Sequence, residues 1–217
     1  EEVKVVLDST PFYGEGGGQV GDSGVMESDG FSAVVSDTTK LNGVYIHNVI
    51  VSSGEINAGD TVTVCVDEKR RHAIARNHTA THLLQKALRI VLGDHVEQAG
   101  SYVNENELRF DFTHFEAMSP EEIQRTEDIV NSEILKFTEV VTKVLPIEEA
   151  RKLGAMMLFG EKYGDIVRVV DVPGFSMEFC GGTHVANIGQ IGCFKIVSES
   201  GVAAGTRRIE AVTGDNV

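Results

Sequence analysis

The chain has 217 residues, 41% of them hydrophobic and 24% charged, which is the composition of a globular protein and excludes extended disorder as its main state. This length allows one large domain or two small ones. The formal net charge of −14 argues against a protein that binds nucleic acid through a basic surface of its own. No apolar run approaches the roughly 20 residues of a membrane-spanning helix, and three scattered cysteines argue against a disulfide framework. We therefore expect a cytoplasmic protein.

The first third of the chain has the pattern of a small all-β domain. Alternating runs at 3–7, 31–37, 44–50 and 60–66 predict strands, separated by turns rich in Gly, Asn and Asp. We expect a small β-barrel over residues 1–68. Its segment GEGGGQVGD lacks the GK[ST] of a P-loop and does not lead into a helix, which disfavours nucleotide binding. A set of tight turns and a backbone surface for a ligand both remain open.

The pattern then changes to helices grouped with strands. Apolar residues three to four apart predict a long helix from residue 68 to the stop at Gly93. A second helix is predicted up to about Lys136, with Ser119 as N-cap and Glu122 completing a capping box. Strands are predicted at 107–112, 139–145, 165–172, 193–200 and 207–213. We expect residues 69–217 to form an α+β domain with a mixed or antiparallel sheet and two main helices.

Two ligand pairs predict a metal site. His78 and His82 are four apart in the predicted helix and therefore lie on one face. Cys180 and His184 are also four apart, around two glycines that let the backbone turn tightly. Imidazole nitrogen and thiolate sulfur are ligands that zinc prefers, so these four side chains are predicted to bind Zn²⁺. Thr79 stands where an HExxH metalloprotease has its glutamate, which disfavours a protease.

The number of ligands leaves the role of the ion open. Four protein ligands are typical of a structural site, whereas a catalytic site keeps one position for water. The glycine-lined CGGTH loop favours the catalytic alternative, and in that case we expect His184 to be the loose ligand. Cys65 and Cys193 lie in alternating apolar strands and are expected to be buried.

Several longer segments follow one another in a recognisable order. They are STPFYGEGGGQVGDSG, HTATH, QAGSYVNENELRFDFTHFEAMSPEEI, LGAMMLFGEKYGDIVRVV and FSMEFCGGTHVANIGQIGCFKIVSESGVAAGTRRIEAVTG. The first is similar to the glycine-rich segment of the small β-barrel domain that precedes the editing domain of bacterial alanyl-tRNA synthetases, and the others resemble that editing domain. Free-standing AlaX editing proteins share the HxxxH, CxxxH and glycine-rich elements. The editing domain of bacterial threonyl-tRNA synthetases is similar in the histidine pair.

The resemblance implies hydrolysis of the ester bond in Ser-tRNA(Ala) or Gly-tRNA(Ala), with Ala-tRNA(Ala) spared. It implies that His78, His82, Cys180 and His184 bind zinc, which would hold the amino group of the substrate or activate a water. A catalytic role follows for the first three, and Gln98 matches a position that handles the seryl substrate. Thr183, Gly181 and Gly182 are further candidates for substrate binding. Glu178 is a candidate to orient a ligand histidine.

The resemblance also implies tRNA(Ala) as the partner. Candidate contacts are the backbone of Gly16, Gly17 and Gly18, and the side chains of Arg70, Arg71, Arg207 and Arg208, which lie in basic clusters at 68–76 and 205–211. Solvated helix ends or strand edges are the alternative for these clusters. The aminoacylation and C-terminal domains of the family would be absent, and a monomer is expected. Two other classes stay open. One is an RNA-binding domain that zinc stabilises and that catalyses no reaction, and the other is an amidase or peptidase.

Overall fold

The computed structural model of the protein describes residues 1–157 and 163–217. Residues 158–162, which belong to the LGAMMLFGEKYGDIVRVV segment, lie outside the described residues. The chain divides into two compact units, Glu1–His72 and Ala73–Val217. This division falls inside the long helix α1 (Glu68–Leu92). No helix in the described part of the chain is both long and apolar enough to cross a membrane.

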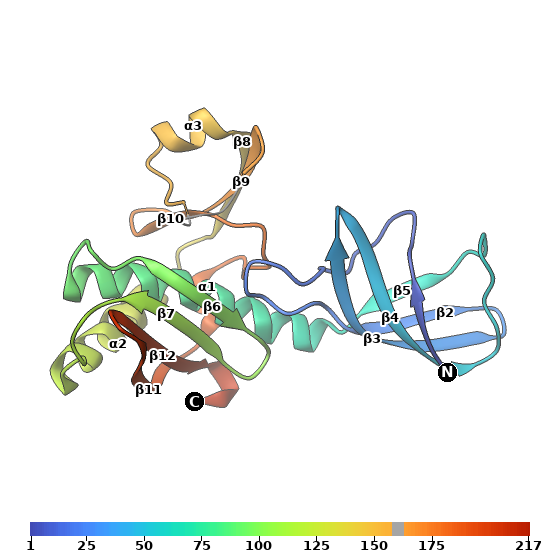
Figure 1. The fold of residues 1–217 in the computed structure, drawn as a ribbon, viewed down its shortest axis with the longest axis horizontal. Helices are drawn as coiled ribbons and strands as arrows, with labels where there is room; N and C mark the ends of the chain where they lie inside the picture. The colour runs from blue at the N-terminus through green and yellow to red at the C-terminus, as the bar shows by residue number, and fades with distance from the viewer. Residues whose placement is uncertain (158–162) are drawn as a thin grey trace. The chain divides into compact units, whose positions relative to one another are not determined.

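Unit 1 is built on one antiparallel sheet of five strands (Figure 1). The strands are β1 (Glu2–Val5), β2 (Gly24–Ser28), β3 (Phe31–Leu41), β4 (Val44–Ser53) and β5 (Thr63–Val66). Their order is β1-β4-β3-β2-β5, and the core includes Phe12, Met26, Phe31 and Val35. The two outer strands, β1 and β5, have no pairing with each other among the described strands. The closed barrel expected from the sequence is therefore not confirmed.

The glycine-rich segment of unit 1 forms a tight hairpin turn. Gly16 and Gln19 exchange both backbone hydrogen bonds, at 3.1 and 3.0 Å. Gly17 and Gly18 between them have φ angles of 58° and 82°, which glycine adopts without strain. Gly21 is required for a different reason, because a Cβ there would lie 2.0 Å from a carbonyl oxygen of β3. Gly17 and Gly18 thus allow the turn, and Gly21 allows a close approach to β3.

Unit 2 contains most of α1 and two antiparallel sheets. The four-stranded sheet has the order β11-β12-β7-β6, and the three-stranded sheet has the order β10-β9-β8. The expected antiparallel strands and two main helices, α1 and α2, are found; the strands form two sheets, and the described chain has a third, short α-helix, α3. Its elements are β6 (Gln98–Val103), β7 (Leu108–Thr113), α2 (Pro120–Ile134), β8 (Val141–Pro146), α3 (Ile147–Lys152), β9 (Ile166–Val172), β10 (Ser176–Phe179), β11 (Phe194–Ala203) and β12 (Thr206–Thr213), with short 3-10 helices at Ile188–Ile191 and Gly214–Asn216.

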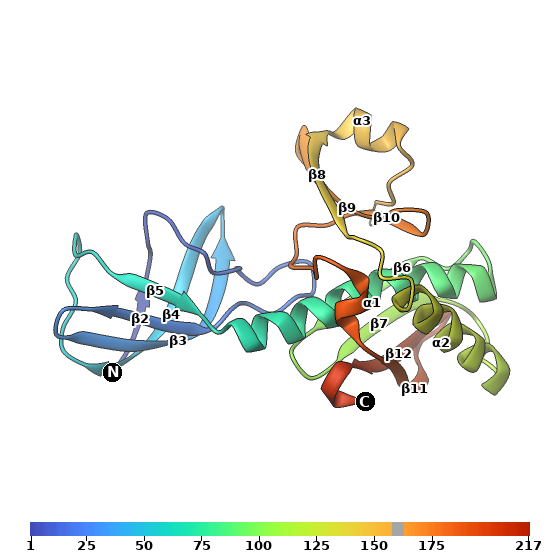
Figure 2. The same ribbon diagram turned by 180° about the vertical axis from the view of Figure 1, so that it is seen from behind.

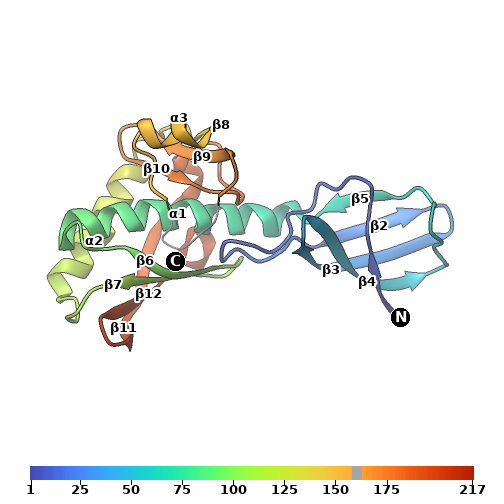
Figure 3. The ribbon, with the colours of Figure 1, turned by 45° about the horizontal axis from the view of Figure 1, so that its top comes forward.

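Helix α1 runs through the middle of unit 2. Figures 1 and 3 show it with the four-stranded sheet on one side and β8–β10 on the other. On the sheet side, the Thr213 hydroxyl donates to Asn77 Oδ1 at 2.6 Å. On the opposite side, the amide of Gln85 donates to the sulfur of Met156 at 2.8 Å. Almost every residue from Ile74 to Leu88 is buried, which is typical of a helix with neighbours all round.

Helix α2 begins with the predicted capping box and covers the edge strand β11 (Figure 2). Ser119 accepts from the backbone N–H of Glu122, whose carboxylate accepts from the backbone N–H of Ser119. Farther along, the Glu127 carboxylate accepts from the backbone N–H of Ile196 at 3.0 Å. These contacts occupy edge groups of β11 that would otherwise be free to pair with another chain.

Candidate metal centre

The structure brings the four predicted ligand residues together in unit 2. His78, His82, Cys180 and His184 offer ligand atoms that all lie within 4.8 Å of one another. The sulfur of Cys180 lies 3.4 Å from Nε2 of His78 and 3.2 Å from Nε2 of His184. The ring centroid of His184 is 4.3 Å from that of His78 and 4.6 Å from that of His82. The helix pair and the loop pair thus form one cluster that can hold a metal ion.

The loop that carries Cys180 is held by an arginine that sequence analysis missed. Arg168, on β9, donates from one guanidinium nitrogen to the carbonyl oxygens of Cys180 and Gly182, both at 2.8 Å. The backbone N–H of Gly182 points back at the sulfur of Cys180, at 3.4 Å. Gly181 has open space where a Cβ would be. A charged residue inside the apolar run IVRVV was the available signal for Arg168.

Two of the histidines have Nδ1 close to a protein oxygen. Nδ1 of His184 lies 3.0 Å from the hydroxyl of Thr79. Nδ1 of His82 lies 3.6 Å from the carboxylate of Glu178, which accepts a hydrogen bond from the hydroxyl of Ser176. Such partners orient the rings of metal-binding histidines. Glu178 is buried beside His82, and its role in orienting that ring stays a prediction.

Burial sets the protonation of the cluster. It lowers the pKa of His78 to about 4, with a smaller contribution from Arg168, and it lowers the pKa values of His82 and His184 well below the usual 6.5. Burial raises the pKa of Cys180 to about 11 and that of Glu178 to about 8. The imidazoles are thus neutral and have a lone pair to offer, whereas the thiol ionises only if a cation stabilises it. Three imidazoles and a thiol suit a borderline transition-metal ion.

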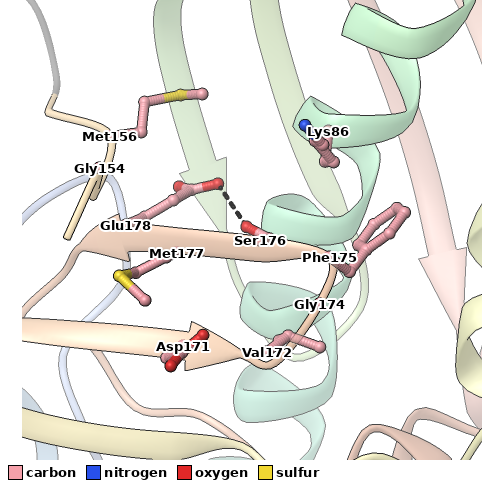
Figure 4. A pocket seen from close by; sticks show the side chains of 10 residues that line it. All are labelled: Lys86, Gly154, Met156, Asp171, Val172, Gly174, Phe175, Ser176, Met177 and Glu178. Atoms are coloured by element: carbon pink, nitrogen blue, oxygen red, sulfur yellow. Dashed lines mark hydrogen bonds between the residues drawn. The ribbon is translucent and has the colours of Figure 1, made fainter.

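A pocket of about 270 Å³ (Figure 4) is lined by Glu178, which lies beside His82, but by none of the four ligand residues. Its polar lining comes from Lys86, Asp171, Ser176 and Glu178. Figure 4 shows Lys86 and Phe175 on one side of the pocket, and Met156 and Glu178 on the other. Lys86 follows His82 by one turn of α1, and Glu178 contacts His82, so the pocket lies about one helical turn from the cluster.

The remaining candidates lie outside the cluster. Gln98 is half-buried at the first residue of β6, where the register with β7 shifts between Gln98 and Gly100. Thr183 is half-buried in the loop between the two loop ligands. The expectation that Cys65 and Cys193 are buried is wrong, because both are exposed. Cys65 pairs with Val25, itself 39% exposed, on the outer face of the sheet of unit 1.

All four arginines that were predicted to contact tRNA have partners within their own unit. Arg70 donates to the carbonyl oxygen of Gly21 at 2.7 Å, and Arg71 pairs with Asp22. Arg207 makes two hydrogen bonds to Glu199, at 2.6 and 2.8 Å. Arg208 makes two to Asp111, at 2.7 and 2.8 Å. A phosphate that binds these side chains would compete with the carbonyl and carboxylate oxygens that they contact now.

Comparison with known proteins gives matches along nearly the whole chain. Residues 167–210 match the family described as the second additional domain of threonyl and alanyl tRNA synthetases, and residues 1–70 match the class II (A) tRNA synthetases. The alanine–tRNA ligase of Geobacillus thermodenitrificans is 56% identical over 216 residues, which are 99% of this chain and 25% of the ligase. That of Fusobacterium nucleatum is 57% identical over 97% of this chain and 24% of the ligase. That of Dechloromonas aromatica is 59% identical over 98% of this chain and 24% of the ligase.

The chain spans about a quarter of the length of these curated relatives. The two family matches lie at its two ends, in unit 1 and in the part of unit 2 that contributes Cys180 and His184. The resemblance found in the sequence is thereby confirmed, and the chain belongs to the alanine–tRNA ligase family.

Proposed function

We propose that this chain hydrolyses the aminoacyl ester of mischarged tRNA(Ala). The observation that carries the proposal is the cluster of buried His78 and His82 with half-buried Cys180 and His184, in a chain of the alanine–tRNA ligase family. A closed structural zinc site is the alternative that the number of ligands favours. The polar pocket beside Glu178 and the glycine-lined loop around Cys180 favour a site that a small ligand reaches.

The ion proposed for the cluster is Zn²⁺, held by its three imidazoles and one thiolate. Zinc would supply a Lewis acid that polarises an ester carbonyl or lowers the pKa of a water. Gly181, Gly182 and Thr183 are proposed to line the substrate, because they lie between the two loop ligands. Gln98 is proposed to bind the seryl side chain, since an amide both donates and accepts hydrogen bonds. A strand bulge like the one beside it often redirects a side chain next to an active site.

Selection for serine and glycine has a physical basis. A pocket that encloses the methyl group of alanine cannot strongly exclude glycine, and an apolar pocket rejects an added hydroxyl poorly. Two groups near the cluster, Ser176 and Glu178, line the pocket with polar atoms that a serine hydroxyl could contact. A second site with such polar contacts adds the discrimination that the first site lacks.

The tRNA(Ala) acceptor end is proposed to contact Arg70, Arg71, Arg207 and Arg208, and the turn at Gly16, Gly17 and Gly18. Because the arginines already have partners, contacts with phosphate would have to replace their present hydrogen bonds and ion pairs. The other three quarters of the ligase, which include its aminoacylation domain, are proposed to supply the remaining affinity that this acidic chain lacks. By itself the chain is proposed to be a monomer.

The test is a time course of Ser-tRNA(Ala) deacylation by this chain, with Ala-tRNA(Ala) run in parallel. Loss of serine with alanine spared supports the proposal, and Cys180→Ala should then remove the activity. Equal hydrolysis of both substrates contradicts the selectivity. No hydrolysis of either by a zinc-loaded chain means that the other domains of the ligase are needed to present the tRNA, or that the site is structural.

A further inference from the structure

We infer that Thr79 is a positioning residue that fixes the ring of His184 for metal binding. This inference rests on the proposed metal site and goes beyond it. The Thr79 hydroxyl is fully buried and lies 3.0 Å from Nδ1 of His184. It also accepts a hydrogen bond from the backbone N–H of Val185, at 3.2 Å. One oxygen of α1 thus holds both the ring of a ligand and the backbone beside it.

The hydrogen bonds define which nitrogen of His184 faces the cluster. A neutral imidazole has one N–H and one lone pair. The Thr79 oxygen that accepts from Val185 has a second lone pair, and Nδ1–H of His184 is the donor within reach. The lone pair of the ring is then on Nε2, the atom that lies 3.2 Å from the sulfur of Cys180. When Nε2 binds a metal, the neutral ring carries its proton on Nδ1, and Thr79 is placed to accept it.

The same contact joins the two halves of the site. Thr79 follows the ligand His78 directly on α1, whereas His184 comes 105 positions later on the loop. One turn of α1 thus carries the first ligand, His78, and also the residue that positions the loop ligand His184. His184, which we expected from the sequence to be the loose ligand, is held by the protein. If Thr79 positions this ring as inferred, an open position for water or substrate is not made by His184 leaving the cluster.

Helix α1 offers a matched control one residue further along. Thr81 is also buried, with 4% of its surface exposed, but its hydroxyl donates to the carbonyl oxygen of Asn77 within the helix, at 2.9 Å. Valine is nearly the same shape as threonine. Thr79→Val leaves Nδ1 of His184 and the N–H of Val185 without their oxygen, whereas Thr81→Val removes a bond that touches no ligand.

The experiment measures the affinity of the whole chain for Zn²⁺ by competition with a chelator, and the visible absorption spectrum of the Co²⁺-loaded chain. Thr79→Val is expected to weaken zinc binding about 10–100-fold, the usual effect of losing a partner of a metal-binding histidine. Its Co²⁺ spectrum is expected to change toward that of His184→Ala. Thr81→Val and Thr79→Ser, which keeps the hydroxyl, should resemble the unaltered chain in both measurements.

The inference is overturned if Thr79→Val binds zinc as tightly as Thr81→Val and keeps the unaltered Co²⁺ spectrum. It is also overturned if Thr79→Ser, folded by circular dichroism, loses as much affinity as Thr79→Val or Thr79→Ala. If the unaltered chain binds no zinc, the proposed metal site itself fails. That result is distinct from a failure of Thr79 alone.

Discussion

Zinc binding to this chain is expected to release two protons at about pH 6.5 and one at about pH 9. At the lower pH the thiol of Cys180, with a pKa of about 11, and the carboxyl of Glu178, with a pKa of about 8, are both protonated. His78, with a pKa of about 4, is already neutral, as are the other two histidines. A cation ionises the thiol, and it lowers the pKa of Glu178 through His82, whose ring lies 3.6 Å from the carboxylate.

The proton count fixes the sign and size of the pH dependence. Ionising a thiol of pKa about 11 at neutral pH costs about 5 kcal/mol, since each pKa unit is worth about 1.4 kcal/mol. Zinc affinity must therefore increase with pH. It is expected to rise about a hundredfold per pH unit while both groups are protonated, and about tenfold per unit once Glu178 is ionised in the metal-free chain.

Calorimetric titration with Zn²⁺ in buffers of different ionisation enthalpy counts these protons. Glu178→Gln should release one proton at both pH values. Cys180→Ala should bind more weakly and release one proton at the lower pH and none at the higher. The reasoning is refuted if the unaltered chain releases equal numbers at both pH values, or if Cys180→Ala does not lower the count. Release of three or more protons at the lower pH would show that the histidines are protonated.

Three further predictions concern stability. Burial lowers the pKa of His47, so the unfolded chain takes up this proton more readily, and unit 1 should lose stability as the pH falls below about 6.5. Hydrogen exchange in β3 and β4 should show this loss, and His47→Gln should abolish it. Gly21→Ala should destabilise unit 1 by about 1–3 kcal/mol or more in thermal unfolding, because its Cβ meets a backbone oxygen. Gly16→Ala, whose Cβ has no neighbour closer than 3.7 Å, should not. Glu127→Ala should cost about 1–3 kcal/mol in urea unfolding, because it leaves a buried backbone N–H of β11 unpaired, whereas Glu127→Gln should cost less; equal losses would contradict this.

Local sequence signals predicted the parts of the fold that depend on near neighbours. The long helix and the capping box at Ser119 and Glu122 were found in the structure, because spacing and capping act within a few residues. Each half of the metal cluster was also visible as a pair four residues apart. Strands β2, β6 and β10 were not predicted. They are five, six and four residues long, and pairing with partner strands (β3 and β5, β7, and β9) stabilises them more than their own composition does.

Contacts between distant residues account for what sequence analysis missed in the site. The pairing of Thr79 with His184, and of Arg168 with the carbonyl oxygens of the CGGTH loop, depends on the docking of β9 and β10 beside α1. The arginine at 208 looked like a free cation in the sequence. Its partner, Asp111, is 97 positions away and could not be assigned before the order of the strands was known.

The four candidate metal ligands are divided between helix α1 and a loop near the end of the chain, and this has a consequence for biosynthesis. His78 and Cys180 are 102 positions apart, so a ribosome that adds about 5–20 residues per second needs about 5–20 s to make the second after the first. During that time strands β6 to β10, which lie beside α1 in the finished protein, are made one after another. The two imidazoles of α1 are therefore present for several seconds before the thiol that lies beside them in the finished protein. The proposed metal site is complete only after His184 has been added, late in the synthesis of each molecule.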